Sequence, residues 1–148
     1  MKIITTSGIV LKEKRELKKA SGDVFFEAYY DTTNHYIFCS WIGIQSLETV
    51  MMGGGLLLSI LQERPCAGLL NSNLELIGPW EVAVPYLTKK WGPKAKELGL
   101  QYFAHVLSPG IFGQRSYKVF REEAKGILRV KAFQDVETAE DWLLLHLG

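Results

Sequence analysis

The sequence predicts an α/β domain in which a mixed β-sheet begins with a hairpin and is flanked by about four α-helices. Segments rich in β-branched and aromatic residues alternate with amphipathic helical segments, in an order close to ββαβαβα. The length of 148 residues corresponds to one domain of ordinary size. Hydrophobic residues make up 47% of the chain and charged residues 22%, which excludes a disordered protein.

The first 22 residues are predicted to form a charged arm, followed by a single domain over residues 23–148. Basic residues crowd between Lys12 and Lys19 with Glu13 and Glu16 among them, and Ser21-Gly22 closes the segment. Alternating signs of this kind are typical of a solvated helix turn or an edge strand. The alternative is a basic arm that binds nucleic acid or anionic lipid.

Residues 24–30 and 36–42 are predicted to be the two strands of a β-hairpin, because a turn-forming polar cluster separates them. Both faces of the second strand are largely apolar, which predicts a position inside the sheet. Ser46 then precedes a helical pattern that carries Gly53-Gly54-Gly55 in its middle. Close packing of this helix on the sheet, or a kink in the helix, explains the glycines, and the alternative of a phosphate-binding loop lacks the Gly-Lys-Ser/Thr sequence of a P-loop.

Residues 66–70 are predicted to be a buried parallel strand that ends at Asn71-Ser72-Asn73. Gly78-Pro79 is predicted to open the next helix, with Pro79 at its first position, Pro85 kinking it and Gly92-Pro93 breaking it. One apolar stripe runs along this helix and consists of Trp80, Val84, Leu87 and Trp91.

Residues 101–107 are predicted to be a second buried strand, which ends at Ser108-Pro109-Gly110. An amphipathic helix over residues 112–125 and an edge or half-exposed strand over residues 127–133 follow. Asp135 is predicted to cap the last helix, whose buried face consists of Val136, Ala139, Trp142, Leu143 and Leu147.

The polar residues that follow the two buried strands are candidate binding residues, because ligands of open α/β sheets collect at the carboxyl ends of parallel strands. These candidates are Asn71, Ser72, Asn73 and Ser108, with Trp80 placed to form a wall of the same site. The alternative is that these residues are ordinary turn formers that bond the local backbone.

Several functions have no support in the sequence. No serine occupies a nucleophile elbow, no histidine spacing suits a metal, and His105 reads as a hydrogen-bonded core histidine. We therefore expect no enzyme, no cofactor and no metal. A net charge of +1 and the absence of a long apolar run predict no nucleic-acid partner and no transmembrane segment. Cys39 and Cys66 are expected to be free thiols in a cytoplasmic protein.

Short motifs over residues 23–148 resemble the bacterial STAS-like family, in particular the SpoIIAA-like group that is also likened to CRAL-TRIO lipid-binding domains. The resemblance is carried by the motifs Ser40-Trp41-Ile42-Gly43, Leu69-Leu70-Asn71, Gly78-Pro79-Trp80, Trp91-Gly92-Pro93, Gly99-Leu100, Tyr102-Phe103-Ala104, Ser108-Pro109, Phe112-Gly113, Ser116 and Ala139-x-x-Trp142-Leu143. It implies a mixed sheet flanked by helices and no established reaction, and it adds Phe112 and Ser116 to the candidate residues.

STAS domains act as switch and interaction modules, and some are phosphorylated on a serine that follows a central strand. Ser72 lies in the comparable place, although Asn71-Ser72-Asn73-Leu74 departs from the Asp-Ser-Ser/Thr-Gly phosphoacceptor motif. The first expected function is therefore a non-enzymatic module that binds a partner protein or a second copy of itself. Phosphorylation of Ser72 would gate that binding through its added negative charge.

The second expected function is a carrier of a small apolar molecule or lipid. Its pocket would lie between the sheet and the helices that carry Met51, Met52, Trp80 and Trp91, because methionine and aromatic side chains make adaptable apolar walls.

Overall fold

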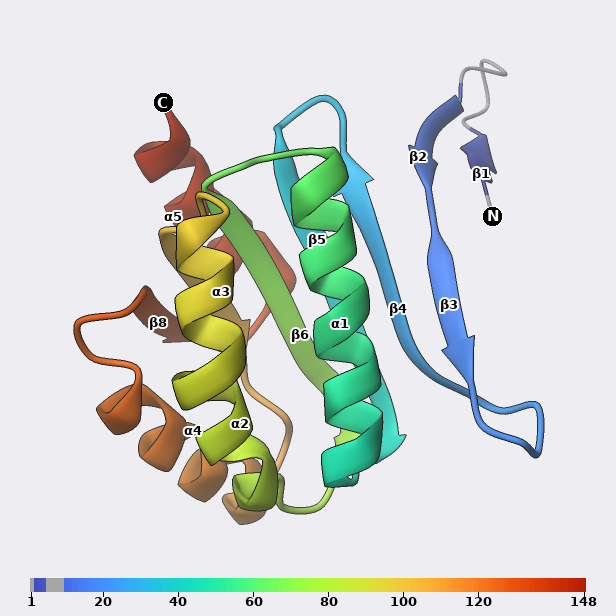
Figure 1. Ribbon diagram of the computed structural model, residues 1–148, viewed down its shortest axis with the longest axis vertical. Coiled ribbons are helices and arrows are strands. Elements are labelled where there is room, and N and C mark those ends of the chain that lie inside the picture. Colours follow the sequence, from blue (N-terminus) through green and yellow to red (C-terminus); the bar gives the residue numbers. More distant parts are fainter. Residues whose placement is uncertain (1, 5–9) are drawn as a thin grey trace.

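The computed structural model describes residues 2–4 and 10–148, which form a mixed sheet with helices on both faces (Figure 1). The strand order is β3-β4-β5-β6-β7-β8; β3, β4 and β5 are antiparallel neighbours, and β5 to β8 run parallel. The predicted α/β class with a mixed sheet is therefore confirmed. The strands of this sheet are β3 (Arg15–Lys18), β4 (Val24–Asp31), β5 (Tyr36–Ile44), β6 (Gly68–Ile77), β7 (Tyr102–Val106) and β8 (Arg129–Phe133).

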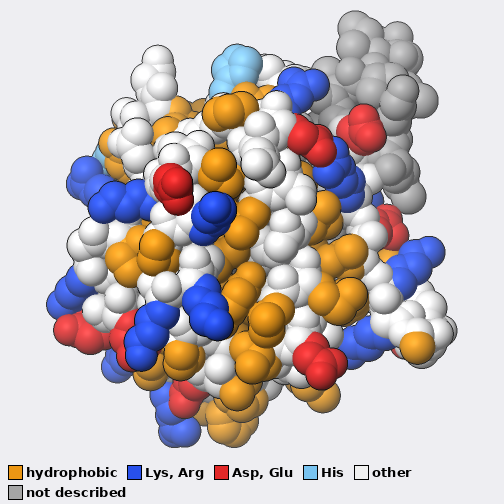
Figure 2. Space-filling view, in the orientation of Figure 1, with side chains coloured by type: hydrophobic (Ala, Val, Ile, Leu, Met, Phe, Trp, Pro, Cys, Tyr) orange, Lys and Arg blue, Asp and Glu red, His pale blue; other side chains and the backbone are white. Residues whose placement is uncertain are grey.

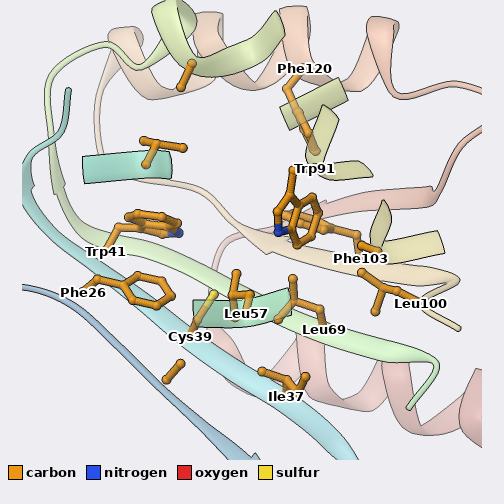
Figure 3. Close-up of a cluster of buried hydrophobic side chains, with 14 of the residues drawn as sticks. Phe26, Ile37, Cys39, Trp41, Leu57, Leu69, Trp91, Leu100, Phe103 and Phe120 are labelled. Atoms are coloured by element: carbon orange, nitrogen blue, oxygen red, sulfur yellow. The ribbon is translucent and has the colours of Figure 1, made fainter. Parts of the chain in front are cut away.

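Helices cover the two faces of the sheet unequally. One face packs against α1 (Leu47–Glu63), a helical segment over residues 81–97 and α4 (Ile111–Glu123), and the other packs against α5 (Val136–Leu147). The larger core lies under the three helical segments, where Trp91 and Phe103 pack edge to face (Figure 3). No helix among residues 2–4 and 10–148 is long and apolar enough to cross a bilayer.

The predicted hairpin is present, since β4 and β5 pair from Phe26↔Trp41 to Asp31↔Tyr36. Asp31 organises the turn, and its Oδ1 accepts hydrogen bonds from the backbone N–H groups of Thr33 and Asn34. Strand β5 lies between β4 and β6, as its two apolar faces predict. Side chains alternate across it, so that Trp41 enters the larger core and Tyr36 the smaller one.

The sheet begins earlier in the chain than the predicted boundary at residue 23. Residues 15–18 form the edge strand β3, in which Leu17 pairs with Phe26 of β4 and packs against the larger core. The alternating charges of this segment suit an edge strand, because charged side chains discourage pairing with another chain. The preceding residues contribute β1 (Lys2–Ile4) and β2 (Val10–Glu13), an antiparallel pair outside the main sheet.

Helix α1 contains its glycines without a break. Ser46 caps it through a reciprocal pair of hydrogen bonds with Thr49. A Cβ added at Gly53 would lie 2.7 Å from Cζ3 of Trp41, and one added at Gly54 would lie 2.8 Å from Oη of Tyr86. Close packing on the sheet, as predicted from the sequence, therefore accounts for Gly53, whereas Gly54 packs against the helical segment over residues 81–97 and the alternative of a kinked helix is wrong.

The predicted end of the strand at Asn71-Ser72-Asn73 is wrong, because β6 continues to Ile77. The three residues are buried inside the strand, and ladder pairing with β5 extends to Ile44↔Ile77. Polar residues in the middle of a buried strand resemble a strand end in sequence. Here the amide side chains satisfy one another inside the core, so the strand has no need to leave it.

The helical segment after β6 also differs from the prediction. Pro79 precedes the first helical turn, and the segment runs through η1 (Glu81–Ala83), α2 (Val84–Tyr86), the π-helical turn η2 (Leu87–Trp91) and α3 (Gly92–Glu97). Gly92-Pro93 does not break it, because the N–H of Gly92 bonds to the carbonyl of Leu87 across the wider π turn. Pro93 then occupies the first turn of α3, where a missing N–H is tolerated.

The last third of the chain follows the prediction closely. Strand β7 is buried, α4 starts one residue before the predicted helix, and β8 is the second edge strand of the main sheet. Asp135 caps α5 by accepting a hydrogen bond of 2.8 Å from the N–H of Thr138. Ala139, Trp142 and Leu143 form the buried stripe of α5.

Candidate functional site

A cavity lies between the sheet and the helices of the larger core. Its volume, counted as the space open to the centre of a water-sized sphere, is about 30 Å³, which is room for a group of a few atoms. The lining is apolar apart from side chains of β6 and β7. It consists of Trp41, Val50, Gly54, Leu57, Asn71, Asn73, Leu76, Trp80, Leu87, Trp91, Phe103, His105 and Phe120.

Asn71 organises the polar side of the cavity. Its Oδ1 accepts hydrogen bonds from Nε1 of Trp41 at 2.8 Å and from Sγ of Cys39 at 3.2 Å. Its Nδ2 lies 3.1 Å from Oδ1 of Asn73 and 3.2 Å from Nδ1 of His105. Asn71 thus joins β5, β6 and β7 through side chains as well as through the backbone ladder.

His105 is the titratable group of this cavity. It is 1% exposed and stacks on Tyr117, with ring centroids 4.8 Å apart. Burial lowers the pKa of His105 to about 3, because the charged imidazolium is poorly solvated there. The neutral ring and its bond to Asn71 confirm the prediction of a hydrogen-bonded core histidine.

Two buried polar atoms at the cavity have no hydrogen-bond partner. Of the three such side-chain atoms in the described part of the chain, Nε1 of Trp80 and Nε2 of His105 belong to lining residues, and Oε1 of Gln45 does not. The centroids of the two rings are 5.6 Å apart. Unsatisfied buried donors are rare in proteins, so each calls for an explanation such as a bound water or ligand.

The structure divides the predicted site residues into three groups. Asn71, Asn73, Trp80 and Trp91 line the cavity. Ser72 lies on the opposite face of β6, where it is buried and its Oγ accepts a hydrogen bond from the N–H of Leu74 at 3.4 Å. The remaining three, Ser108, Phe112 and Ser116, lie near the start of α4.

The residues at the start of α4 have separate surroundings. The Oγ of Ser116 accepts a hydrogen bond from the backbone N–H of Trp80 at 3.0 Å and so fixes the position of that residue. Ser108 is buried beside Gly113, where any larger side chain would collide with its Oγ. Phe112 is 52% exposed and does not line the cavity.

The predicted pocket walls are only partly correct. Met51 and Met52 are 46% and 52% exposed and do not line the cavity, because they lie on the solvent side of α1. The cavity volume suits a group of a few atoms rather than a lipid chain. The prediction that both methionines form pocket walls is wrong, because hydrophobicity alone does not distinguish the two faces of an apolar helix.

The pairing of Asn71 with His105 was not predicted. In the sequence each is an isolated polar residue, one at a predicted strand end and one in a predicted strand. The two are register partners across β6 and β7. The sequence does contain a signal for this pairing: a polar residue occurs at a corresponding place in each of two consecutive buried strands. Two such residues can satisfy each other's hydrogen-bonding groups.

Exposed apolar side chains gather at the carboxyl end of the parallel strands, which is the lower end in Figure 1. Hydrophobic atoms are visible at the same end in the space-filling view (Figure 2). We call this group the apolar rim, and it consists of Ile44, Leu47, Ile77, Val82, Ile111 and Phe112. Its members are at least 40% exposed. Three of them lie within three residues of a cavity residue in the chain: Leu47 is near Val50, Ile77 follows Leu76, and Val82 is two residues after Trp80.

The chemistry available at the cavity is hydrogen bonding by neutral groups. Burial raises the pKa of the Cys39 thiol, so this thiol is not an activated nucleophile. Among the residues that the structure describes, no three His, Cys, Asp or Glu side chains gather to hold a metal. The arrangement suits binding of an uncharged group within apolar walls.

Comparison of the chain with models of protein families and with curated protein sequences finds no match.

Proposed function

We propose that the protein is a non-enzymatic binding module of the STAS-like type that holds a small, largely apolar molecule between its sheet and helices. The observation that supports this proposal best is the cavity itself, where two unpartnered N–H or ring nitrogen groups face apolar walls. Small-molecule sites typically combine a hydrophobic lining with a few converging polar groups. The motifs that resemble STAS-like proteins and the order of strands and helices are compatible with this type of module.

Native mass spectrometry of gently purified protein tests the proposal, with extraction and identification of any retained molecule. We expect a guest at one copy per chain. Leu76→Phe, which enlarges a lining side chain, is expected to lose the guest, whereas Leu74→Phe on the same strand is expected to retain it, because Leu74 lies outside the lining. Equal retention by both variants, or an empty wild-type protein that binds no small apolar probe, would contradict the proposal.

A second candidate function, self-association through the apolar rim, is favoured by the charges around it. Glu48 and Glu81 lie in the first turns of α1 and η1, the elements that also carry Leu47 and Val82 of the rim. Arg115 follows Ile111 and Phe112 in α4, and Nζ of Lys19 donates a hydrogen bond to the carbonyl of Ile44. A two-fold arrangement would bring the acidic side chains of one copy to the basic side chains of the other. A surface flanked by both signs favours a second copy of the chain over an anionic membrane.

Sedimentation equilibrium over roughly 1 to 100 µM protein tests this second candidate. We expect a dimer that Phe112→Ser weakens, since Phe112 is the aromatic side chain of the rim. Val119→Ser is the control, because Val119 is similarly accessible on α4 but lies two turns away. A wild-type monomer throughout the concentration range excludes self-association.

A further inference from the structure

The hydrogen-bond network of the cavity fixes which atoms of His105 carry hydrogen. The indole nitrogen of Trp41 is a donor only, so the atom of Asn71 that faces it must be the carbonyl oxygen Oδ1. The amide nitrogen Nδ2 of Asn71 then faces Oδ1 of Asn73 and Nδ1 of His105. Because Nδ2 donates, Nδ1 of His105 is an acceptor without hydrogen.

A neutral histidine with an unprotonated Nδ1 carries its hydrogen on Nε2. His105 is neutral, since burial holds its pKa at about 3. The unpartnered Nε2 is therefore an N–H donor, and so is the unpartnered Nε1 of Trp80. Both unsatisfied atoms of the cavity lining are donors.

The two N–H donors determine which kind of ligand suits the cavity. On the basis of the proposed binding function, we infer that the cavity binds a small neutral molecule through one oxygen acceptor, of the ketone, aldehyde or ester type, that receives N–H groups from Trp80 and His105. A carbonyl oxygen has two lone pairs and no hydrogen that would need a further partner. The ring centroids of the two donors are 5.6 Å apart, which is close enough for both to contact one small ligand.

The surroundings exclude a charged ligand. Trp91, Phe103 and Phe120 form much of the apolar wall, and a carboxylate there would lose its hydration without meeting a cation. The donors are also fixed in place before binding. Ser116 holds the backbone of Trp80, and His105 lies between Tyr117 and Asn71. Donors that are already oriented lose little freedom when the ligand binds.

Acetone and 2-methylpropene are a matched pair of probes, because they differ only in the replacement of the carbonyl oxygen by a methylene group. Binding is followed by two-dimensional ¹H–¹⁵N NMR of the folded chain. We expect acetone to shift the indole N–H resonance of Trp80 in the direction of a new hydrogen bond, a shift that 2-methylpropene does not cause because it has no acceptor. Trp80→Phe removes one donor and keeps an aromatic ring, and it is expected to weaken acetone binding about fivefold to tenfold while 2-methylpropene binding changes little.

The outcomes separate this inference from the proposed function. If 2-methylpropene shifts the indole N–H resonance of Trp80 as acetone does, or if it is the one probe of the two that enters the cavity, the oxygen acceptor is wrong and the binding function stands. If neither probe perturbs the resonances of lining residues, both fail. Contacts of the two N–H groups with water alone, undisturbed by acetone, also overturn the inference, because the donors then serve a structural water. The wild-type comparison decides these outcomes even if Trp80→Phe does not fold.

Discussion

Asn71 is the side chain on which the buried polar network depends. Its amide contacts Trp41, Cys39, Asn73 and His105, which come from three neighbouring strands. A buried group that loses its partner has no access to bulk solvent, so each of these groups relies on Asn71 for a hydrogen bond.

Replacing Asn71 with alanine is therefore expected to lower the free energy of unfolding by about 2 to 4 kcal/mol, because it leaves buried donors without an acceptor. Urea denaturation of the purified variant measures the change. Gln114→Ala on the exposed side of α4 is the control and should change stability by less than about 0.5 kcal/mol. A similar small change for Asn71→Ala would mean that the network contributes little to stability.

His105 makes the stability of the fold depend on pH. Its pKa is about 3 in the folded chain and close to 6.5 when unfolded, so the unfolded chain binds more protons between these values. Stability from this group is fully present above pH 6.5 and is lost as the pH falls toward 3. The slope attributable to it is at most about 1.4 kcal/mol per pH unit.

Comparison of the wild type with His105→Phe over pH 4 to pH 8 isolates this contribution, since phenylalanine keeps the ring stack on Tyr117 but does not titrate. We expect the wild type to lose stability faster than the variant on acidification. Parallel pH curves for the two proteins would show that His105 does not titrate with a lowered pKa.

At the scale of elements, helix α1 shows how the glycine run is divided between packing and solvent. Gly53 and Gly54 are buried against Trp41 and Tyr86, but nothing lies within 4 Å of a Cβ added at Gly55. Three residues of one type in a row therefore have two different roles. Gly53 permits the close approach of α1 to the sheet, and Gly54 permits its close approach to the helical segment over residues 81–97.

Gly55→Ala is expected to stabilise the protein by about 0.5 to 1 kcal/mol, because alanine has the higher helix propensity and meets no neighbour. Gly53→Ala is expected to destabilise it by about 1 to 3 kcal/mol, since its Cβ would overlap the ring of Trp41. Thermal unfolding of the two variants measures this opposite pair of effects. A stabilising Gly53→Ala would contradict the packing explanation.

At the scale of the whole molecule, burial decreases from the centre of the sheet to its edges. Strands β5 and β6 have neighbours on both sides and helices on both faces, whereas β3 and β8 are edge strands with several partly exposed side chains. Local opening requires less free energy where fewer apolar contacts are broken.

Native-state hydrogen exchange is therefore expected to be slowest for the amides of β5 and β6 and fastest, among the strands of the main sheet, for those of β3. Mass spectrometry of peptides from each strand measures the order. The exchange rates of β3 also test whether the folded domain begins before the predicted boundary at residue 23. Protection of β3 equal to that of β5 would mean that residues 15–18 unfold only with the entire domain.

Sequence reasoning was accurate where a structure depends on neighbouring residues. The caps at Ser46 and Asp135 and the hairpin turn at Asp31 involve partners two to three residues away, so their chemistry can be read directly from the chain. It was inaccurate where a distant partner changes the local preference. Asn71 and Asn73 favour turns, but inside β6 their amides bond to each other and to other strands.

Thus the sequence by itself determined the α/β class, the hairpin, the inner position of β5 and the packing of Gly53 in α1 against the sheet. Only the tertiary structure decided that β6 continues past Asn73 and that Gly92-Pro93 continues a helix. It alone brought Trp80 and His105 to one cavity while leaving Met51 at the surface. The physical reason is that hydrophobic periodicity and capping act over a few residues, whereas the pairing of buried polar groups is set by strand register between segments far apart in the chain.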